Sequence, residues 1–178
     1  MKTDKIIVSE ASYKSSDPYD IIRSNISVVS LLDEEGIEEE NMHEDSITSY
    51  YVDYYISQYK NGNFSQFVWN SGWSTELNKI IEGGLKKIGA QKHLDLFLEQ
   101  SSKVEGLNKV ELETFLENEY FGSNPTRDIL KNDSFYSLEE NLTELHAQWL
   151  KNHPDLKVLT IDDMFSELEK WVGREIER

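Results

Sequence analysis

The chain has 178 residues and a formal net charge of −16, with 34 Asp and Glu against 18 Lys and Arg. This charge disfavours direct binding to nucleic acid or to an anionic membrane, because both are polyanions and repel it. The sequence holds no cysteine, which excludes disulfides, cysteine-ligated zinc, iron–sulfur clusters and thiol catalysis.

The N-terminal segment predicts neither secretion nor membrane insertion. Its apolar run Ile6-Ile7-Val8 is too short for the apolar region of a signal peptide. No window approaches the roughly 20 apolar residues of a membrane span, so we expect a soluble, cytoplasmic protein. Apolar residues make up 38% of the chain, and a chain of this length buries roughly 70% of its unfolded surface. We therefore expect one domain, residues 1–178.

Apolar residues recur at helical spacing along most of the chain, and no alternating strand pattern of any length is present. Lys5 to Ser9 is expected to be extended or a short strand at best, and Lys157 to Thr160 an extended linker. Short helices are expected at 64–70 and 124–130. The longer expected helices cover 17–34, 44–60, 75–88, 90–103, 108–121, a stretch from Ser134 or Ser137 to His153, and 161–176. The sequence thus predicts an all-α fold, a single compact domain of about seven or eight helices.

Local signals set several of these boundaries. Asp17 is expected to cap the first helix, with Pro18 at the first helical position. Asn61-Gly62-Asn63 is expected to end the second helix. Ser74 or Thr75 is expected to cap the next long helix and Gly89 to end it, and Asn124-Pro125-Thr126 is expected to open the short helix through Leu130. Thr160, three residues before Asp163, resembles a capping signal for the last helix.

The negative charge is unevenly distributed. The net charge is −8 over residues 1–60, −3 over 61–120 and −5 over 121–178. The stretch 33–45 has eight acids and no Lys or Arg. Such a run is either solvated or held ready for a basic partner, whose Arg side chains pair with carboxylates much as with phosphates. We take these eight as candidate partner-binding residues: Asp33, Glu34, Glu35, Glu38, Glu39, Glu40, Glu44 and Asp45. Weaker candidates lie in the C-terminal third: Asp162, Asp163, Glu167 and Glu169.

No pattern of a catalytic or metal site is present. The four histidines, His43, His93, His146 and His153, form no His-Glu-x-x-His pair. Ser71 lies in Asn-Ser-Gly, which lacks the Gly-x-Ser-x-Gly elbow, and the chain has no glycine-rich phosphate loop. We therefore expect no enzyme activity, no metal and no cofactor.

A stripe of tyrosines runs along the second expected helix. It spreads too widely to form one helix face, so part of it must be core, and the remainder is a candidate dimer or partner surface. The stripe comprises Tyr50, Tyr51, Tyr54, Tyr55 and Tyr59.

The residues after this stripe carry a family resemblance. The run Asn-Gly-Asn-Phe-Ser-Gln-Phe-Val-Trp-Asn, residues 61–70, resembles the core motif of the bacterial DNA-mimic protein family, which has Asn-Gly-Gly-Phe-x-Gln-Phe. Asn63 replaces the second glycine, and Asn tolerates a left-handed backbone better than most residues. The motif residues are expected to be structural, with Gln66 and Asn70 satisfying buried backbone groups. They are Asn61, Gly62, Phe64, Gln66, Phe67, Trp69 and Asn70.

The resemblance implies an all-α homodimer whose acidic surface imitates the DNA backbone and keeps a transcription factor from its operator. The partner would be a basic DNA-binding protein, with no direct binding to nucleic acid or membrane. The alternative is an immunity protein that neutralises a basic toxin or nuclease with the same carboxylates. A third interpretation is that the charge serves solubility alone.

Overall fold

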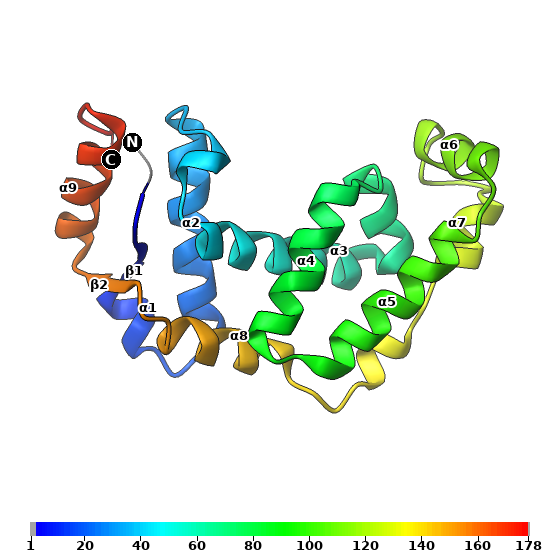
Figure 1. The fold of residues 1–178 in the computed structure, drawn as a ribbon, viewed down its shortest axis with the longest axis horizontal. Coiled ribbons are helices and arrows are strands. Elements are labelled where there is room, and N and C mark those ends of the chain that lie inside the picture. The colour runs from blue at the N-terminus through cyan, green and yellow to red at the C-terminus, as the bar shows by residue number, and fades with distance from the viewer. Residues whose placement is uncertain (1–2, 178) are drawn as a thin grey trace. The chain divides into compact units, whose positions relative to one another are not determined.

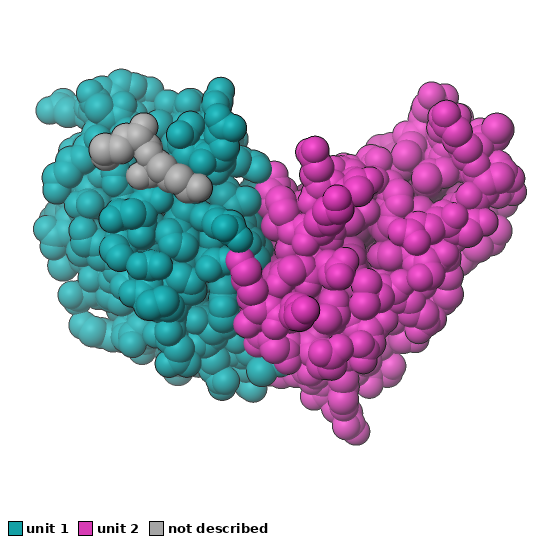
Figure 2. Space-filling view, in the orientation of Figure 1, with its two compact units in different colours: residues 1–50, 142–178 teal, residues 51–141 magenta. Residues whose placement is uncertain are grey.

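The computed structural model describes residues 3–177, which form two compact units (Figures 1 and 2). Unit 1 comprises residues 1–50 and 142–178, and unit 2 comprises residues 51–141. Within the described part of the chain there are nine α-helices, two short 3-10 helices and two four-residue strands. The all-α prediction is confirmed. The two units are defined by how their residues pack, which does not test whether the chain is one domain. The expected single domain therefore stays a prediction.

Unit 1 is built around a small parallel sheet. Strand β1 (Ile6–Ser9) pairs with β2 (Leu156–Leu159), with Ile6 opposite Leu156 and Ser9 opposite Leu159. The sequence predicts two separate extended segments here. Their pairing could not be foreseen, because about 150 residues separate them and neither shows strand alternation.

Five α-helices and one 3-10 helix complete unit 1. They are α1 (Glu10–Lys14), α2 (Tyr19–Glu34), η1 (Glu39–Asn41), the first residues of α3 (Glu44–Ser71), α8 (Leu142–Lys151) and α9 (Ile161–Val172). The N-cap of α2 is Pro18, one residue later than the predicted Asp17, and Asp17 Oδ1 accepts the Tyr19 N–H at 2.9 Å. Thr160 caps α9 as predicted, accepting from the Asp163 N–H.

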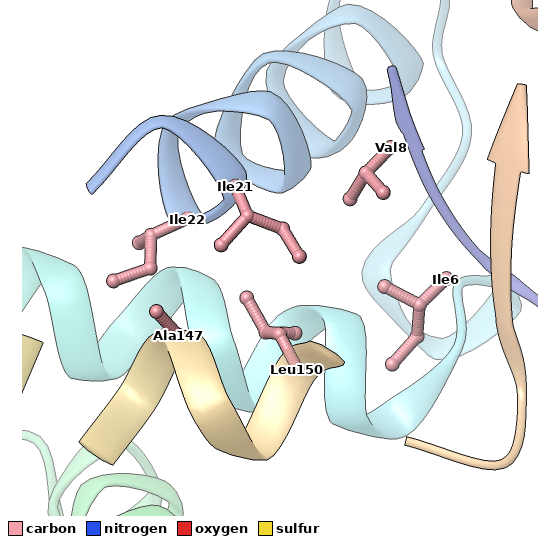
Figure 3. Close-up of a cluster of buried hydrophobic side chains, with 6 residues drawn as sticks. All are labelled: Ile6, Val8, Ile21, Ile22, Ala147 and Leu150. Carbon is pink, nitrogen blue, oxygen red and sulfur yellow. The ribbon is translucent and has the colours of Figure 1, made fainter. Parts of the chain in front are cut away.

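The core of unit 1 is aliphatic. Side chains from β1, α2 and α8 point toward one another in Figure 3 and are at most 3% exposed. Burial of this kind is worth about 25 cal/mol per Å² of apolar surface removed from water, so it anchors the strand to both helices. The cluster consists of Ile6, Val8, Ile21, Ile22, Ala147 and Leu150.

Unit 2 contains the rest of α3 with four helices and a 3-10 helix. They are α4 (Thr75–Ile88), α5 (Gln91–Glu105), α6 (Lys109–Glu117), α7 (Pro125–Leu130) and η2 (Ser134–Ser137). The caps Ser74 and Asn124 and the left-handed terminator Gly89, at φ +80°, occur where expected. The helix expected over 108–121 ends four residues early, since Asn118 is already extended.

The helix predicted from Ser134 or Ser137 to His153 is wrong over its first part. Only a 3-10 turn forms at 134–137, and α8 begins at Leu142. The intervening chain crosses the N-terminus of α5, where Ala90 offers no side-chain cap. Glu140 Oε1 instead accepts the N–H groups of Lys92 and His93, at 3.0 and 3.2 Å. A carboxylate at a helix N-terminus is favourable, so this contact stabilises the start of α5.

Candidate acidic interface

The structure places all twelve candidate carboxylates in unit 1. The eight between positions 33 and 45 run from the end of α2 to the start of α3, and the other four lie on α9. Unit 1 carries 20 acidic and 9 basic residues, a net charge of −11, whereas unit 2 carries 14 and 9, a net charge of −5. The charge is thus concentrated in the unit that holds the candidates.

The segment after α2 is a folded turn with a fixed backbone. Gly36 takes a left-handed conformation at φ +82°, and the Ile37 N–H bonds Leu32 O at 2.9 Å. Met42, at 1% exposure, anchors the other end of η1 in the core. Between these anchors Glu38, Glu39 and Glu40 are exposed.

Four of the twelve candidates are half-buried and bonded within unit 1. Glu35 pairs with Arg174, and Asp45 lies 3.0 Å from His153 Nε2. Glu167 accepts from Lys170 at 3.1 Å and Lys157 at 3.2 Å, and the Lys170 hydrogen bond is the main cause of its lowered pKa. Glu169 accepts the Ile176 N–H at 3.5 Å. These four contribute charge but are held by the fold. The eight exposed candidates are Asp33, Glu34, Glu38, Glu39, Glu40, Glu44, Asp162 and Asp163.

A cluster that the sequence did not reveal holds the start of α3. His43 Nδ1 accepts the Asp45 N–H at 3.1 Å and so caps the helix. His43 Nε2 lies 3.6 Å from Asp155, and the rings of His43 and His153 meet edge to face at 5.5 Å. Asp155 also accepts from Lys5 at 2.8 Å, and that hydrogen bond lowers its pKa. More than 100 residues separate His43 from His153 and Asp155, so no spacing pattern signals these contacts.

The histidine cluster fixes the acidic segment to the sheet. The sequence predicts a helix up to His153; α8 ends at Lys151, and the His153 ring lies 3.0 Å from the Asp45 carboxylate. Asp155 directly precedes β2, and Ile6 of β1 donates its N–H to Asp155 O at 3.1 Å. Glu44 and Asp45, the candidate carboxylates that follow η1, therefore lie on a segment that hydrogen bonds fix to the sheet. Among residues 3–177, no group of three or more His, Asp or Glu side chains is arranged to hold a metal ion.

The motif of residues 61–70 lies in unit 2. Phe64 and Phe67 are fully buried, and the Trp69 indole N–H donates to Asn118 O at 2.9 Å. The assigned role of two amides is wrong: Gln66 and Asn70 both donate to the Gln58 side-chain oxygen and satisfy no backbone group. Asn70 is exposed.

At the turn of this motif, Asn63 adopts the backbone conformation expected of the glycine that it replaces. Gly62 and Asn63 leave the helical region, and Asn63 has φ 75° and ψ 179°. Asn63 Oδ1 accepts the Phe64 N–H at 2.7 Å and the Asn132 N–H at 2.5 Å. Asn61 is exposed at the end of the preceding helical stretch. The amide side chain offsets the unfavourable backbone by bonding the chain on both sides.

The tyrosine stripe is largely core. Tyr55 and Tyr59 are fully buried, and burial raises the pKa of both hydroxyls. Tyr59 Oη donates to Asn132 O at 2.7 Å, and its ring stacks on Phe135 at 4.4 Å. Tyr50, Tyr51 and Tyr54 are half-buried. None of these side chains is fully exposed, which leaves little of the stripe for a partner.

Comparison with known proteins gives one family match. The model of the DMP19-like protein family matches residues 40–153, nearly two thirds of the chain. No curated protein and no solved structure matches. None of the helices formed by residues 3–177 combines the length and apolar character that a membrane span requires. The matched region contains the motif of residues 61–70, the tyrosine stripe and the histidine cluster as far as His153. The chain belongs to the DMP19-like protein family.

Proposed function

We propose that the protein is a non-enzymatic DNA mimic that presents the carboxylates of unit 1 to a basic DNA-binding protein. The observation that carries this proposal is the net charge of −11 on unit 1, which holds all twelve candidates. Duplex DNA presents one negative charge per roughly 1.7 Å of its axis, so a site built for DNA needs a dense array of anions. Membership of the DMP19-like family supports the same function.

The fixed backbone beneath the exposed carboxylates supports this function further. A decoy binds more tightly when its charges need no ordering, because ordering a mobile segment costs free energy on binding. The turn at Gly36, the buried Met42 and the His43 cap order the segment in the unbound protein. Arg side chains of the partner would pair with Glu38, Glu39 and Glu40 as with phosphates. A transcription factor captured in this way is kept from its operator.

The experiment compares two triple charge reversals. Glu38→Lys, Glu39→Lys and Glu40→Lys alter unit 1, whereas Glu105→Lys, Glu117→Lys and Glu119→Lys make the same charge change at exposed positions of unit 2. Native protein first captures partners from a lysate of the source organism at low salt, and mass spectrometry identifies them. Binding of the purified partner is then measured with and without competing duplex DNA.

We expect the unit 1 reversal to weaken binding about 100-fold at 0.1 M salt and the unit 2 reversal to weaken it less than 5-fold. Duplex DNA should displace the partner. Equal losses in both variants, with circular dichroism showing intact folds, would contradict a site on unit 1. A basic toxin among the captured proteins would favour the immunity alternative, and no salt-sensitive basic partner would leave the charge a role in solubility alone.

The homodimer implied by the family is part of the proposal and has a candidate surface on unit 2. Large apolar side chains of α6, α7 and the adjoining turns are exposed there: Val110 at 70%, Phe121 at 82% and Ile129 at 65%. Contiguous exposed apolar surface is typical of interfaces. Light scattering of native protein and of Phe121→Ser tests this, since a dimer held there should dissociate in the variant. A native monomer at all concentrations would contradict the dimer.

A further inference from the structure

Unit 1 contains a pocket between α2 and α9 with a volume of about 310 Å³. The two helices lie on either side of β1 in Figure 1, and the last residue of β1, Ser9, lines the pocket. This volume is at the lower end of the 300–1,000 Å³ that small-molecule pockets occupy. It suits one short alkyl chain or one ring.

Both helices contribute apolar residues to the pocket. Val28 and Leu31 come from α2, and Met164 and Leu168 come from α9. Ile161, also on α9, contributes to the lining and is 56% exposed. An apolar body seated here would be removed from water on several sides, at a gain of about 25 cal/mol per Å².

The polar residues of the lining offer hydrogen-bond donors; Arg23 and Ser24 come from α2, the helix that also contributes Val28 and Leu31. Ser24 is 9% exposed; its Oγ accepts the Ser9 N–H at 2.9 Å, and its own hydroxyl hydrogen has no acceptor among residues 3–177. Ser12 Oγ accepts from Ser9 Oγ at 2.9 Å, and within the same described residues its hydrogen also lacks an acceptor. Both serines therefore have a donor to offer a ligand in the pocket.

The charge of the lining residues favours an anionic ligand. Arg23 is the one charged side chain among the lining residues that the structure describes, and no carboxylate is among them. Its Nη2 donates to Asp20 at 2.6 Å, while the guanidinium group has five N–H donors in all. A ligand that fits must bring acceptors, preferably charged, to these polar residues and apolar surface to the remaining lining.

We propose that the pocket between α2 and α9 binds a small apolar monocarboxylate, with its carboxylate at Arg23, Ser12 and Ser24 and its hydrocarbon body against Met164 and Leu168. This site differs in chemistry from the acidic interface, because it binds an anion whereas the interface presents anions. The whole chain carries a net charge of −16, which repels anions. Long-range repulsion is screened within about 8–10 Å at physiological ionic strength, so it does not prevent entry.

The first test is titration of the full chain with octanoate at 0.15 M salt. Calorimetry should show saturable binding of one octanoate per chain. Amide signals in heteronuclear spectra should shift at Ser24, Leu31 and Leu168 and stay in place throughout unit 2. Thermal unfolding should move upward by about 5–10 °C at a concentration 100 times Kd. No saturable binding, or shifts spread over both units, would overturn the proposal.

A plug variant tests the location. Ser27 lines the pocket, and its Oγ donates only to Arg23 O, at 3.0 Å, so Ser27→Trp fills the space without changing charge. Ser166 on α9 makes the same kind of bond to Asp162 O, at 2.9 Å, and does not line the pocket, so Ser166→Trp is the matched control. Octanoate should bind Ser27→Trp at least 10-fold more weakly and Ser166→Trp as the native chain. Equal affinity in both variants would place the ligand elsewhere.

A second pair of probes tests the head group. Arg23→Gln should weaken octanoate binding about 10-fold and leave neutral octan-1-ol unchanged. Lys14→Gln removes an equal charge from an exposed pair with Glu10 outside the pocket, and should leave both affinities unchanged. Equal loss of both probes in Arg23→Gln would show that the guanidinium group does not select the carboxylate. Native spectra map the site even if the tryptophan variant does not fold.

Discussion

The two units are similar in length but differ in what fills them. Unit 1 combines an aliphatic cluster with buried polar pairs, such as Asn25 with Ser46 and Ser49 with His146. Unit 2 is filled by aromatic rings that meet edge to face, with Tyr55 5.3 Å from both Phe67 and Phe97. Unit 1 carries −11 and unit 2 carries −5.

This difference separates the motif of residues 61–70 from the candidate site. The motif at 61–70 builds the aromatic core of unit 2, whereas the candidate carboxylates lie on unit 1. The family match covers residues 40–153 and does not by itself assign a role to the charge of unit 1. Because fold does not fix function, that charge has to be judged separately.

The largest expected effect is the loss of an aromatic side chain from unit 2. Phe67→Ala removes a fully buried ring that also contacts Phe64 at 5.8 Å, and should lower the free energy of unfolding by about 3–5 kcal/mol. Urea denaturation measures the loss, and hydrogen exchange should locate it in residues 51–141. Glu82→Ala, at an exposed position of α4 in the same unit, is the control and should change stability by less than about 0.5 kcal/mol. Equal losses would show that the aromatic cluster is not the core of the unit.

Acid should lower the stability of unit 1, because His146 is buried there. Burial lowers the pKa of this fully buried ring from 6.5 to about 3. Between those values the unfolded chain binds a proton that the folded chain does not, so stability falls as the pH drops below 6.5. At about 1.36 kcal/mol per pH unit, the loss at pH 4.5 approaches about 2.7 kcal/mol.

His146→Gln tests this, since an amide can keep the bond to Ser49 Oγ, 2.8 Å from His146 Nε2. Its stability should depend less on pH between 7 and 4.5 than that of the native chain. His93→Gln in unit 2 should change the dependence less: burial also lowers the pKa of His93, but a hydrogen bond to Glu140 O opposes the shift. An unchanged pH slope in His146→Gln would refute a neutral buried ring.

The turn of the motif should tolerate glycine at position 63 better than alanine. Asn63→Ala keeps a Cβ at φ 75° and leaves the Phe64 and Asn132 N–H groups without their acceptor, which should cost about 2 kcal/mol. Asn63→Gly loses the same bonds but relieves the backbone, and should cost about 1 kcal/mol less. Chemical denaturation ranks the two. A glycine variant no better than alanine would mean that the side chain alone stabilises the turn.

Prediction from sequence succeeded where the information is local. Helical spacing located most of the helices, and single residues such as Ser74, Gly89, Asn124 and Thr160 set their ends. It failed where distant segments meet. The β1–β2 pairing, the Asp155–Lys5 contact and the use of Glu140 as a cap for α5 join residues about 50 to 150 positions apart.

The candidate site shows the same limit. The run of acids between 33 and 45 is visible in the sequence, but the partners of Glu35 and Asp45 are Arg174 and His153. The sequence could not distinguish these held carboxylates from exposed ones such as Glu38. Nor could it show that the acids of α9 belong to the same unit, because that depends on the return of the chain after residue 142.

The smallest expected effect tests the charge contrast itself. Like charges on a compact unit repel one another, so removing some of them should stabilise the unit that carries more. Neutralising Glu38, Glu39 and Glu40 to Gln should raise the free energy of unfolding by about 0.5 kcal/mol at 0.01 M salt, where charges interact over roughly 30 Å. The same change at Glu105, Glu117 and Glu119 should raise it less, because unit 2 carries −5 against −11. In 1 M salt the screening length falls to about 3 Å and both gains should vanish. A gain that persists in 1 M salt would have to come from local helix or turn preferences. A larger gain in unit 2 would mean that the net charge of a unit does not determine the repulsion between its exposed carboxylates.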